Sequence, residues 1–174
     1  MAQPVNIRPA TPDDAAALAA IYNRYVATST ATFDTESKSA AERAAWVAHR
    51  EPCHPVLVAE REGAVVGFGA LSPFRERLAY RFTAEAGVYL EPEECGAGTG
   101  ALLLRHLIER GRDAGLHVVV AQIVADNAAS LRLTEKFGFE RVGVLREVGR
   151  KFDTWLDVVI LQLVLGESAG FPQG

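Results

Sequence analysis

The chain has 174 residues, of which 49% are hydrophobic and 23% charged, and its formal net charge is −4 at pH 7. Its scattered Lys and Arg residues exclude the basic patch that nucleic-acid binding requires. Length and composition predict one globular domain over residues 1–174, with a core at about 5–165 and a frayed C-terminal tail. Because neither a signal peptide nor a membrane-spanning apolar run is recognisable, we expect a cytoplasmic protein without a membrane partner.

The first half of the chain predicts one strand, two helices and a hairpin. Thr11 and Pro12 suit the N-cap and the first position of a helix. Gly63 is the turn residue between two apolar strands, and Gly67 and Gly69 in the second of them indicate a bulge or a close backbone approach. The expected elements are a strand at 5–10, helices at 11–27 and 38–51, and strands at 56–62 and 64–74.

The second half predicts strands and helices arranged around a glycine-rich loop. The strand at 117–125 is almost wholly apolar, as expected for a strand that is buried on both faces. The expected elements are strands at 81–92 and 117–125, helices at 98–115 and 126–138, and strands at 139–148 and 155–165. The order βααβββαβαββ predicts an α/β or α+β fold in which helices cover a central sheet.

The segment from Glu85 to Leu104 carries the most specific chemical pattern. Gly96, Gly98 and Gly100 allow a tight curl that directs consecutive backbone N–H groups into one concavity. The helix that starts on the last of these glycines adds unpaired N–H groups and the positive end of its dipole, so the loop suits a phosphate. With a glutamate on the preceding strand as a base, the segment predicts an enzyme with a phosphorylated cofactor.

Two familiar phosphate-binding motifs fit this loop poorly. A P-loop requires Lys followed by Ser or Thr after the last glycine, and the chain has Ala101 and Leu102 there. A dinucleotide-binding site fits formally, because Gly96, Gly98 and Ala101 satisfy G-x-G-x-x-A and Asp126 closes the next strand. That motif normally follows the first strand of a larger sheet, whereas this loop is in the middle of the chain.

The order of elements together with the loop resembles the GNAT superfamily of acetyl-CoA-dependent N-acetyltransferases. Three blocks, at 73–92, 126–143 and 148–163, resemble its phosphinothricin and methionine-sulfoximine acetyltransferase branch more narrowly. The resemblance implies a mixed, mostly antiparallel sheet of about seven strands flanked by about four helices. It also implies acetyl-CoA as cosubstrate and a homodimer. No metal is expected, since neither the two cysteines nor the histidines have a metal-binding spacing.

The resemblance also implies roles for particular residues. Glu85 matches the glutamate of the family's T-x-E motif, and on an alternating strand it shares a face with Gly87 and Tyr89 among small apolar neighbours. We expect it to act as the general base, directly or through water, although an ordinary ion pair is the alternative. The expected cofactor-binding residues are Val88, Tyr89, Leu90, Cys95, Gly96, Ala97, Gly98, Thr99, Gly100, Asn127 and Ser130.

Asn127 has a second interpretation as a plain helix N-cap. The chain departs from the family pattern at Cys95, where Arg or Gln is usual, and at Thr134, where the branch commonly has His. The first departure removes a cation from the pyrophosphate site, and Glu93 and Glu94 add two acids beside it. We therefore expect weaker cofactor binding, because only the backbone N–H groups and the helix dipole remain.

The acceptor is expected to be a small amino-acid-like molecule that is acetylated on its α-amine, such as a phosphinothricin-like or methionine-sulfoximine-like compound. The residues that match the acceptor pocket of the branch are Phe74, Arg75, Arg77, Thr83 and Glu85. An arginine can bind an α-carboxylate with two parallel hydrogen bonds, although a solvated loop would look the same in sequence. Two alternatives stay open: a non-catalytic acyl-CoA sensor, and a GNAT enzyme acting on a peptide N-terminus or a polyamine.

Overall fold

The computed structural model describes residues 4–166, so most of the expected frayed tail lies outside the described residues. The strands are β1 (Asn6–Pro9), β2 (Val56–Arg61), β3 (Ala64–Pro73), β4 (Thr83–Leu90), β5 (Val118–Val124), β6 (Glu140–Lys151) and β7 (Thr154–Val164). The α-helices are α1 (Ala15–Thr28), α2 (Ala40–Ala48), α3 (Thr99–Asp113) and α4 (Ala128–Lys136). In these residues, none of the helices combines the length and hydropathy needed to cross a bilayer.

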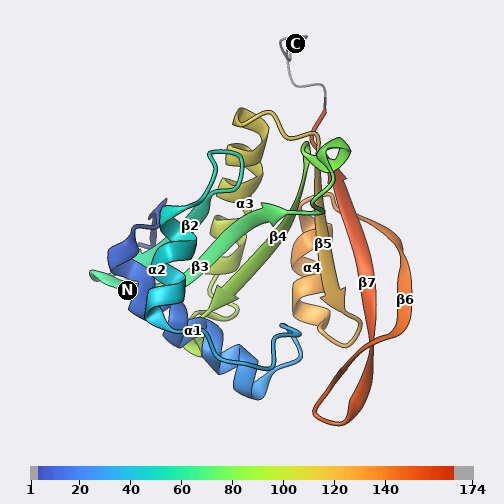
Figure 1. Cartoon of the computed structure of the whole chain (residues 1–174), viewed down its shortest axis with the longest axis horizontal. Coiled ribbons are helices and arrows are strands. Elements are labelled where there is room, and N and C mark those ends of the chain that lie inside the picture. Colours follow the sequence, from blue (N-terminus) through green and yellow to red (C-terminus); the bar gives the residue numbers. More distant parts are fainter. Residues whose placement is uncertain (1–3, 167–174) are drawn as a thin grey trace.

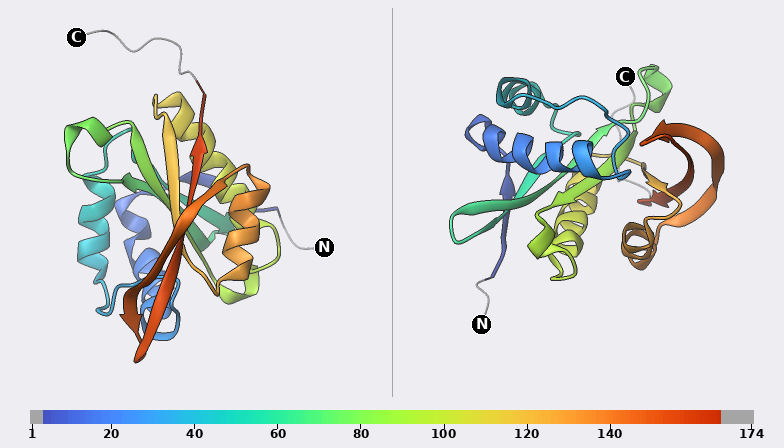
Figure 2. Two further views of the ribbon diagram at one scale, coloured as in Figure 1. Left: turned by 90° about the vertical axis from the view of Figure 1, so that its right-hand side faces the viewer. Right: turned by 90° about the horizontal axis from the view of Figure 1, so that it is seen from below.

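The strands form one seven-stranded sheet in the order β1-β2-β3-β4-β5-β7-β6, in which only the β4–β5 pair is parallel. Helices α1 and α2 cover one face of the sheet, and α3 and α4 cover the other (Figures 1 and 2). The core on the α3 side includes Leu71, Leu103 and Leu107, and the smaller core on the α1 side includes Leu18 and Phe68. The expected mixed, mostly antiparallel sheet with four flanking helices is confirmed.

Helix ends differ from the expected ones where local capping is stronger than helix propensity. A 3-10 turn at Pro12–Asp14 precedes α1, and Thr11 and Asp14 form a reciprocal capping box there. Helix α2 starts after Ser39, whose side-chain oxygen accepts a hydrogen bond from the Glu42 N–H at 3.1 Å, so residues 38 and 39 are not helical. Helix α3 likewise starts at Thr99, one residue into the expected range 98–115, because Gly98 is the left-handed N-cap at φ 91°.

The two glycines of β3 allow a close backbone approach, as the sequence indicated. A Cβ on Gly67 would lie 2.6 Å from the Leu90 side chain, and one on Gly69 would lie 2.8 Å from Leu107. The register of the β2–β3 pair also shifts beside Gly67: Ala59 lies opposite Gly67 and Glu60 opposite Val65, so the extra residue of this bulge is Val66 on β3. The glycines therefore let β4 and α3 pack directly against β3, and this packing fixes the strand that carries Glu85.

Candidate active site

Strands β4 and β5 lie side by side at one end and separate at the other, as Figure 1 shows. Their parallel pairing is limited to Thr83 with Val118, Ala84 with Val119, and Glu85 with Val120. A cavity of about 580 Å³ occupies the gap beyond this point and is lined by residues 86–89 of β4 and 121–124 of β5. Its walls on the α1–α2 side include Tyr22, Thr32, Arg43, Trp46, Phe68 and Ser72, and on the α4 side Asn127, Ser130, Leu133 and Thr134.

Glu85 lies half-buried at the point where the two strands part. Its Oε2 accepts a hydrogen bond from Gln122 Nε2 on β5 at 2.8 Å, and both residues line the cavity. Glu85 faces the same side as Gly87 and Tyr89, as expected from strand alternation. Gln122 was missed by the sequence analysis, although a single amide in an otherwise apolar strand was a usable signal. The pair holds a carboxylate oriented at the mouth of the strand gap.

The edge of β4 that faces the gap has free backbone groups. Because the Glu91 N–H donates to Val66 O of β3 at 2.9 Å, alternate residues such as Val88 and Leu90 direct their N–H and C=O groups away from β3. At Leu90 both groups meet the hydroxyl of Tyr25, at 3.2 Å for the N–H and 2.9 Å for the oxygen. The backbone N–H and C=O groups of Val88 therefore point into the gap, where a ligand can bond them. Those of Leu90 are already bonded to Tyr25.

The glycine-rich loop follows β4 at its far end. Gly96 and Gly98 have φ values of 81° and 91°, in the region that favours glycine. The first hydrogen bond within α3 runs from the Leu102 N–H to Gly98 O at 3.1 Å, so the N–H groups of residues 99–101 have no acceptor inside the helix. Cys95, Ala97 and both glycines are exposed. The loop thus has the unpaired donors and the helix N-terminus that bind a phosphate.

One of the two acids beside the loop is neutralised. Glu94 is buried, and its carboxylate accepts hydrogen bonds from Arg61 Nε and Nη2 of β2 at 2.9 and 3.0 Å. The Thr99 hydroxyl donates a third bond to the same carboxylate. These contacts, the Arg61 bond first, lower the pKa of Glu94. Glu94 thus lies beside the loop, as the sequence indicated, but its charge is paired with Arg61, and it anchors the loop and the start of α3.

Helix α4 contributes three polar residues to the cavity wall. Asn127 Oδ1 accepts a hydrogen bond from the Ser130 N–H at 3.1 Å, so Asn127 does act as the N-cap of the helix. Its amide nitrogen is not part of that bond. The buried Thr134 hydroxyl donates within the helix, with Ser130 O and Leu131 O both at 3.0 Å. At the position where the branch commonly has His, the chain therefore has a hydroxyl whose proton is engaged by the backbone.

The acceptor residues expected on the β3–β4 loop lie apart from the cavity walls. Arg75 and Arg77 are exposed, and the Arg75 guanidinium lies 4.7 Å from the centre of the Phe74 ring, which itself contacts Tyr80 edge to face. Thr83 is half-buried at the start of β4. Among the described residues that line the cavity, Glu85 is present, but the other four expected acceptor residues are not. The structure thus brings five of the expected residues together at one cavity: Glu85, Val88, Tyr89, Asn127 and Ser130. The four other acceptor residues lie outside the cavity, on the loop before β4 and at the start of β4.

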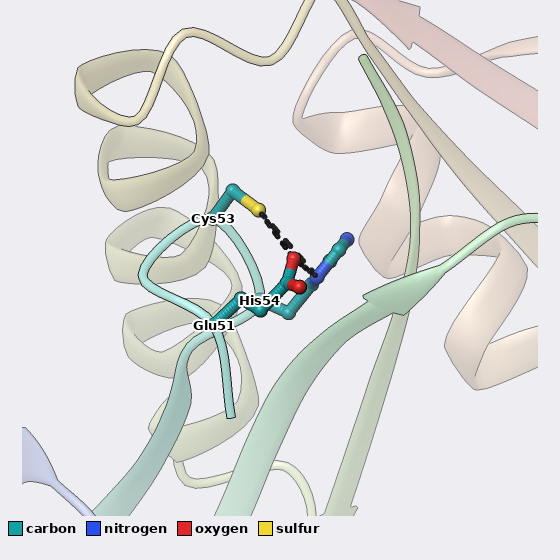
Figure 3. Close-up of side chains that lie close together, drawn as sticks. All are labelled: Glu51, Cys53 and His54. Carbon is teal, nitrogen blue, oxygen red and sulfur yellow. Dashed lines mark hydrogen bonds and ion pairs between the residues drawn. The ribbon is translucent and has the colours of Figure 1, made fainter. Parts of the chain in front are cut away.

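A second group of chemically active side chains lies outside the cavity. Glu51, Cys53 and His54 converge on the loop between α2 and β2 (Figure 3), and their donor atoms lie within 4.8 Å of one another. The Cys53 thiol contacts Glu51 Oε2 at 3.7 Å and His54 Nδ1 at 3.5 Å. Burial raises the pKa of the Cys53 thiol and lowers that of His54. Since metals bind the thiolate, these shifts favour a protonated Cys53 thiol and an uncharged His54 ring, which do not hold a metal strongly.

The gap between β4 and β5, the unpaired donors of the loop and the carboxylate at the gap's mouth together fit an enzyme that binds a phosphorylated acyl carrier. Residues 18–139 match the acetyltransferase (GNAT) family, and the chain belongs to that family. The L-amino acid N-acyltransferase MnaT of Escherichia coli K12 is 40% identical over 164 residues, which are 94% of this chain and 95% of the relative.

Another relative points to the same branch. The L-methionine sulfoximine/L-methionine sulfone acetyltransferase of Salmonella typhimurium LT2 is 39% identical over 166 residues, covering 95% of this chain and 97% of the relative. A solved structure of yncA, a putative acetyltransferase from Salmonella typhimurium with its cofactor acetyl-CoA, superposes with a TM-score of 0.93 at 37% identity. That match covers 99% of this chain and 100% of the other. The protein is therefore an N-acetyltransferase, and the expected membership of the GNAT superfamily is confirmed.

Proposed function

We propose that this enzyme transfers acetyl from acetyl-CoA to the α-amine of a small L-amino acid with an oxygen-bearing side chain. L-methionine sulfoximine, L-methionine sulfone and phosphinothricin are the acceptors to try first. The observation that carries the proposal is the position of Glu85, which lies where β4 and β5 separate and is held by Gln122. The similarity to relatives that act on amino acids of this kind supports the acceptor class.

The residues present fit acetyl-CoA without side-chain cations. The N–H groups of Gly96, Gly98 and the first turn of α3 would hold the pyrophosphate, because those of Cys95 and Ala97 are already bonded to backbone oxygens. The pairing of Glu94 with Arg61 removes one opposing charge. The Val88 backbone would bond the pantetheine arm inside the gap, with Asn127 and Ser130 of α4 on its other side. Bound there, the cosubstrate supplies a thioester whose carbonyl carbon accepts the amine.

Glu85 would take the proton that the ammonium of the acceptor must lose before it can attack, either directly or through one water. The N–H of Val88 would donate to the carbonyl oxygen as negative charge develops on it. The C–N bond then forms, the C–S bond breaks, and the thiolate leaves with the electron pair and takes up the second proton that the nitrogen loses. A thiolate needs little help near neutral pH, because the thiol pKa is about 8.5.

Arg75 and Arg77 remain the proposed ligands of the α-carboxylate. They belong to the loop between β3 and β4. Ser72, which lies on β3 just before this loop, pairs with Glu85 on the adjacent strand β4. Cosubstrate binding or a second subunit would have to bring them closer, because they are exposed in the single chain. Glu85 is the one carboxylate among the described residues that line the cavity, and this favours an amino acid over a polyamine.

We also propose a homodimer. Strand β6 is the edge of the sheet, and the β6–β7 hairpin exposes a set of large apolar side chains. They are Val142, Val144, Leu145, Val148, Phe152 and Trp155, each exposed by 46–59%. An apolar surface of this kind on an edge hairpin fits a partner subunit. Sedimentation of the wild type and of Val144→Glu would test it, and a monomeric wild type would contradict it.

The function itself is tested by measuring thiol release from acetyl-CoA with a panel of acceptors. We expect turnover with the amino acids named above, and little with spermidine or a peptide N-terminus. Glu85→Gln is the matched control, because it keeps the size of the side chain and a hydrogen-bonding partner for Gln122. Binding of acetyl-CoA without turnover for any acceptor would reject the proposal in favour of an acyl-CoA sensor.

A further inference from the structure

Helix α2 places a buried cation in the wall of the acceptor side of the cavity. Arg43 is only 8% exposed and lines the cavity. Within residues 4–166, no carboxylate lies within ion-pair distance of its guanidinium, and its buried Nε has no hydrogen-bond partner. A buried, unpaired cation is costly for a fold, so its presence calls for a ligand that the protein itself does not supply.

Aromatic rings hold this guanidinium by its faces. Its central carbon lies 4.1 Å from the centre of the Tyr22 ring, 4.9 Å from that of Trp46 and 5.9 Å from that of Phe68. Stacking of this kind occupies the faces of the guanidinium and leaves the N–H donors at its edge. The Tyr22 hydroxyl is itself engaged with Thr32 and Asp34, at 2.8 and 2.9 Å. Arg43 is thus a fixed, pre-oriented donor group with unused hydrogen-bonding capacity.

The register of the sheet separates the backbone position of Glu85 from that of Phe68, one of the rings around Arg43. Glu85 lies opposite Ser72, whereas Tyr89 lies opposite Phe68, the residue over which Arg43 stacks. Four residues along a strand span about 13 Å between the backbone positions of Glu85 and Tyr89, which leaves room along this wall for an extended amino acid. Among the described residues that line the cavity, Glu85 is the one anion and Arg43 the one cation.

We infer that Arg43 binds the oxygen-bearing distal group of the acceptor side chain, such as a sulfone, sulfoximine or phosphinate. This inference rests on the proposed function, because it assumes that the α-amine is held at the Glu85 end. A guanidinium donates well to such oxygens and gains little from a thioether sulfur. Arg43 would therefore make the enzyme prefer methionine sulfone over methionine, two acceptors that differ only in the two oxygens on sulfur.

The test compares kcat/KM for L-methionine sulfone and L-methionine in the wild type and in Arg43→Met. The methionine side chain keeps much of the packing between the rings and removes the charge and every donor. We expect kcat/KM for the sulfone to fall about tenfold to a hundredfold, the range for losing hydrogen bonds to a charged group. Kcat/KM for methionine and the KM for acetyl-CoA should change less than about threefold.

Arg50→Met is the matched control, because Arg50 stacks on the same Trp46 at 4.6 Å but bonds the backbone oxygens of His54 and Leu71. We expect Arg50→Met to change kcat/KM for methionine sulfone and for methionine by the same factor. Equal losses for both acceptors in Arg43→Met would overturn the inference and assign Arg43 to packing.

A wild type that turns over no amino acid would reject the proposed function and leave binding as the readout. Calorimetric titration of the sulfone and of methionine into the wild type and Arg43→Met, with CoA present, then decides the matter. Tighter binding of the sulfone that is lost in the variant supports the inference. Absence of any preference in the wild type overturns it.

Discussion

The proposed cofactor side and the proposed acceptor side of the site are built in different ways. On the α3–α4 side, the site consists mainly of backbone: the N–H groups of the glycine-rich loop, the first turn of α3 and the free edge of β4 at Val88. On the α1–α2 side it consists of side chains, with Arg43 stacked among rings and Glu85 held by Gln122. The cofactor side suits a cosubstrate with a constant shape, and the acceptor side suits an acceptor that differs from one relative to another.

This difference predicts where substitutions are tolerated. A backbone site depends on the conformation of the loop, so the side chain at Cys95 can vary while the donors remain. A side-chain site is more sensitive to a single change, because the described wall has one cation, Arg43, and one carboxylate, Glu85. We therefore expect the largest functional effects on the acceptor side and the smallest at the loop.

The largest expected effect is that of Glu85→Gln, which removes the base and keeps the shape. We expect kcat/KM for the amino acid to fall by about a hundredfold or more, the usual scale of general acid–base catalysis. The loss should shrink at high pH, where the free amine is abundant and needs no base. Rates measured from pH 7 to 10 check this. A Gln variant with an unchanged rate at pH 7 would remove Glu85 from the mechanism.

The next effect is expected at the loop between β3 and β4. Arg75→Lys or Arg77→Lys should raise the KM for the amino acid much more than that for acetyl-CoA. Losing a bidentate clamp on the α-carboxylate costs on the order of 1.5–3 kcal/mol. Steady-state kinetics with each substrate varied in turn give both constants. If neither lysine variant changes the KM for the acceptor, both arginines stay exposed to solvent during the reaction, and another group binds the α-carboxylate.

The sequence was sufficient for features that depend on near neighbours. The N-cap at Thr11, the left-handed glycines of the loop and the face of β4 that carries Glu85 all follow from residues a few positions apart. The acceptor wall was not predictable in this way. Arg43 lies in an alanine-rich helix that looks like an ordinary solvated helix in sequence, and its burial depends on rings from α1 and β3.

Partners that are distant in the sequence also explain why the roles of Glu94 and Leu90 could not be predicted. Arg61 meets Glu94 across 33 positions of the chain, and Tyr25 meets Leu90 across 65. Neither contact leaves a local pattern, because each depends on how β2 and α1 are placed against the end of β4. A carboxylate beside a phosphate loop therefore looked repulsive in sequence, although the fold neutralises it.

A smaller effect is expected from Glu94→Gln, which weakens the anchor of the loop. We expect a loss of folding free energy of roughly 1–2 kcal/mol at pH 7, since the Arg61 and Thr99 bonds are no longer charge-assisted. The pKa of Glu94 is lowered in the fold, so its contribution is present above its unfolded pKa and is lost as the pH falls through the lower folded value. Urea unfolding at pH 7 and at pH 3 should therefore show a smaller difference between variant and wild type at pH 3. A constant difference at the two pH values would contradict this role.

The smallest expected effect concerns Cys95, where the chain departs from its family. Cys95 is exposed at the head of the loop, and the nearest buried acid, Glu94, is already bonded to Arg61. A guanidinium in Cys95→Arg would therefore be free to meet the pyrophosphate rather than Glu94. A new, partly exposed charge pair is worth about 0.5–1.5 kcal/mol, so CoA should bind roughly two- to tenfold more tightly. The gain should fade with added salt, because exposed pairs are screened.

Calorimetric titration of CoA into the wild type, Cys95→Arg and the size-matched neutral Cys95→Met, at low and high ionic strength, separates charge from side-chain bulk. The arginine variant should gain affinity only at low salt, and the methionine variant at neither. Equal or weaker binding by Cys95→Arg at low salt would mean that the pyrophosphate lies elsewhere than at this loop. The contrast between a cofactor side made of backbone and an acceptor side made of side chains would then fail, because the glycine-rich loop would no longer be the cofactor side of the site.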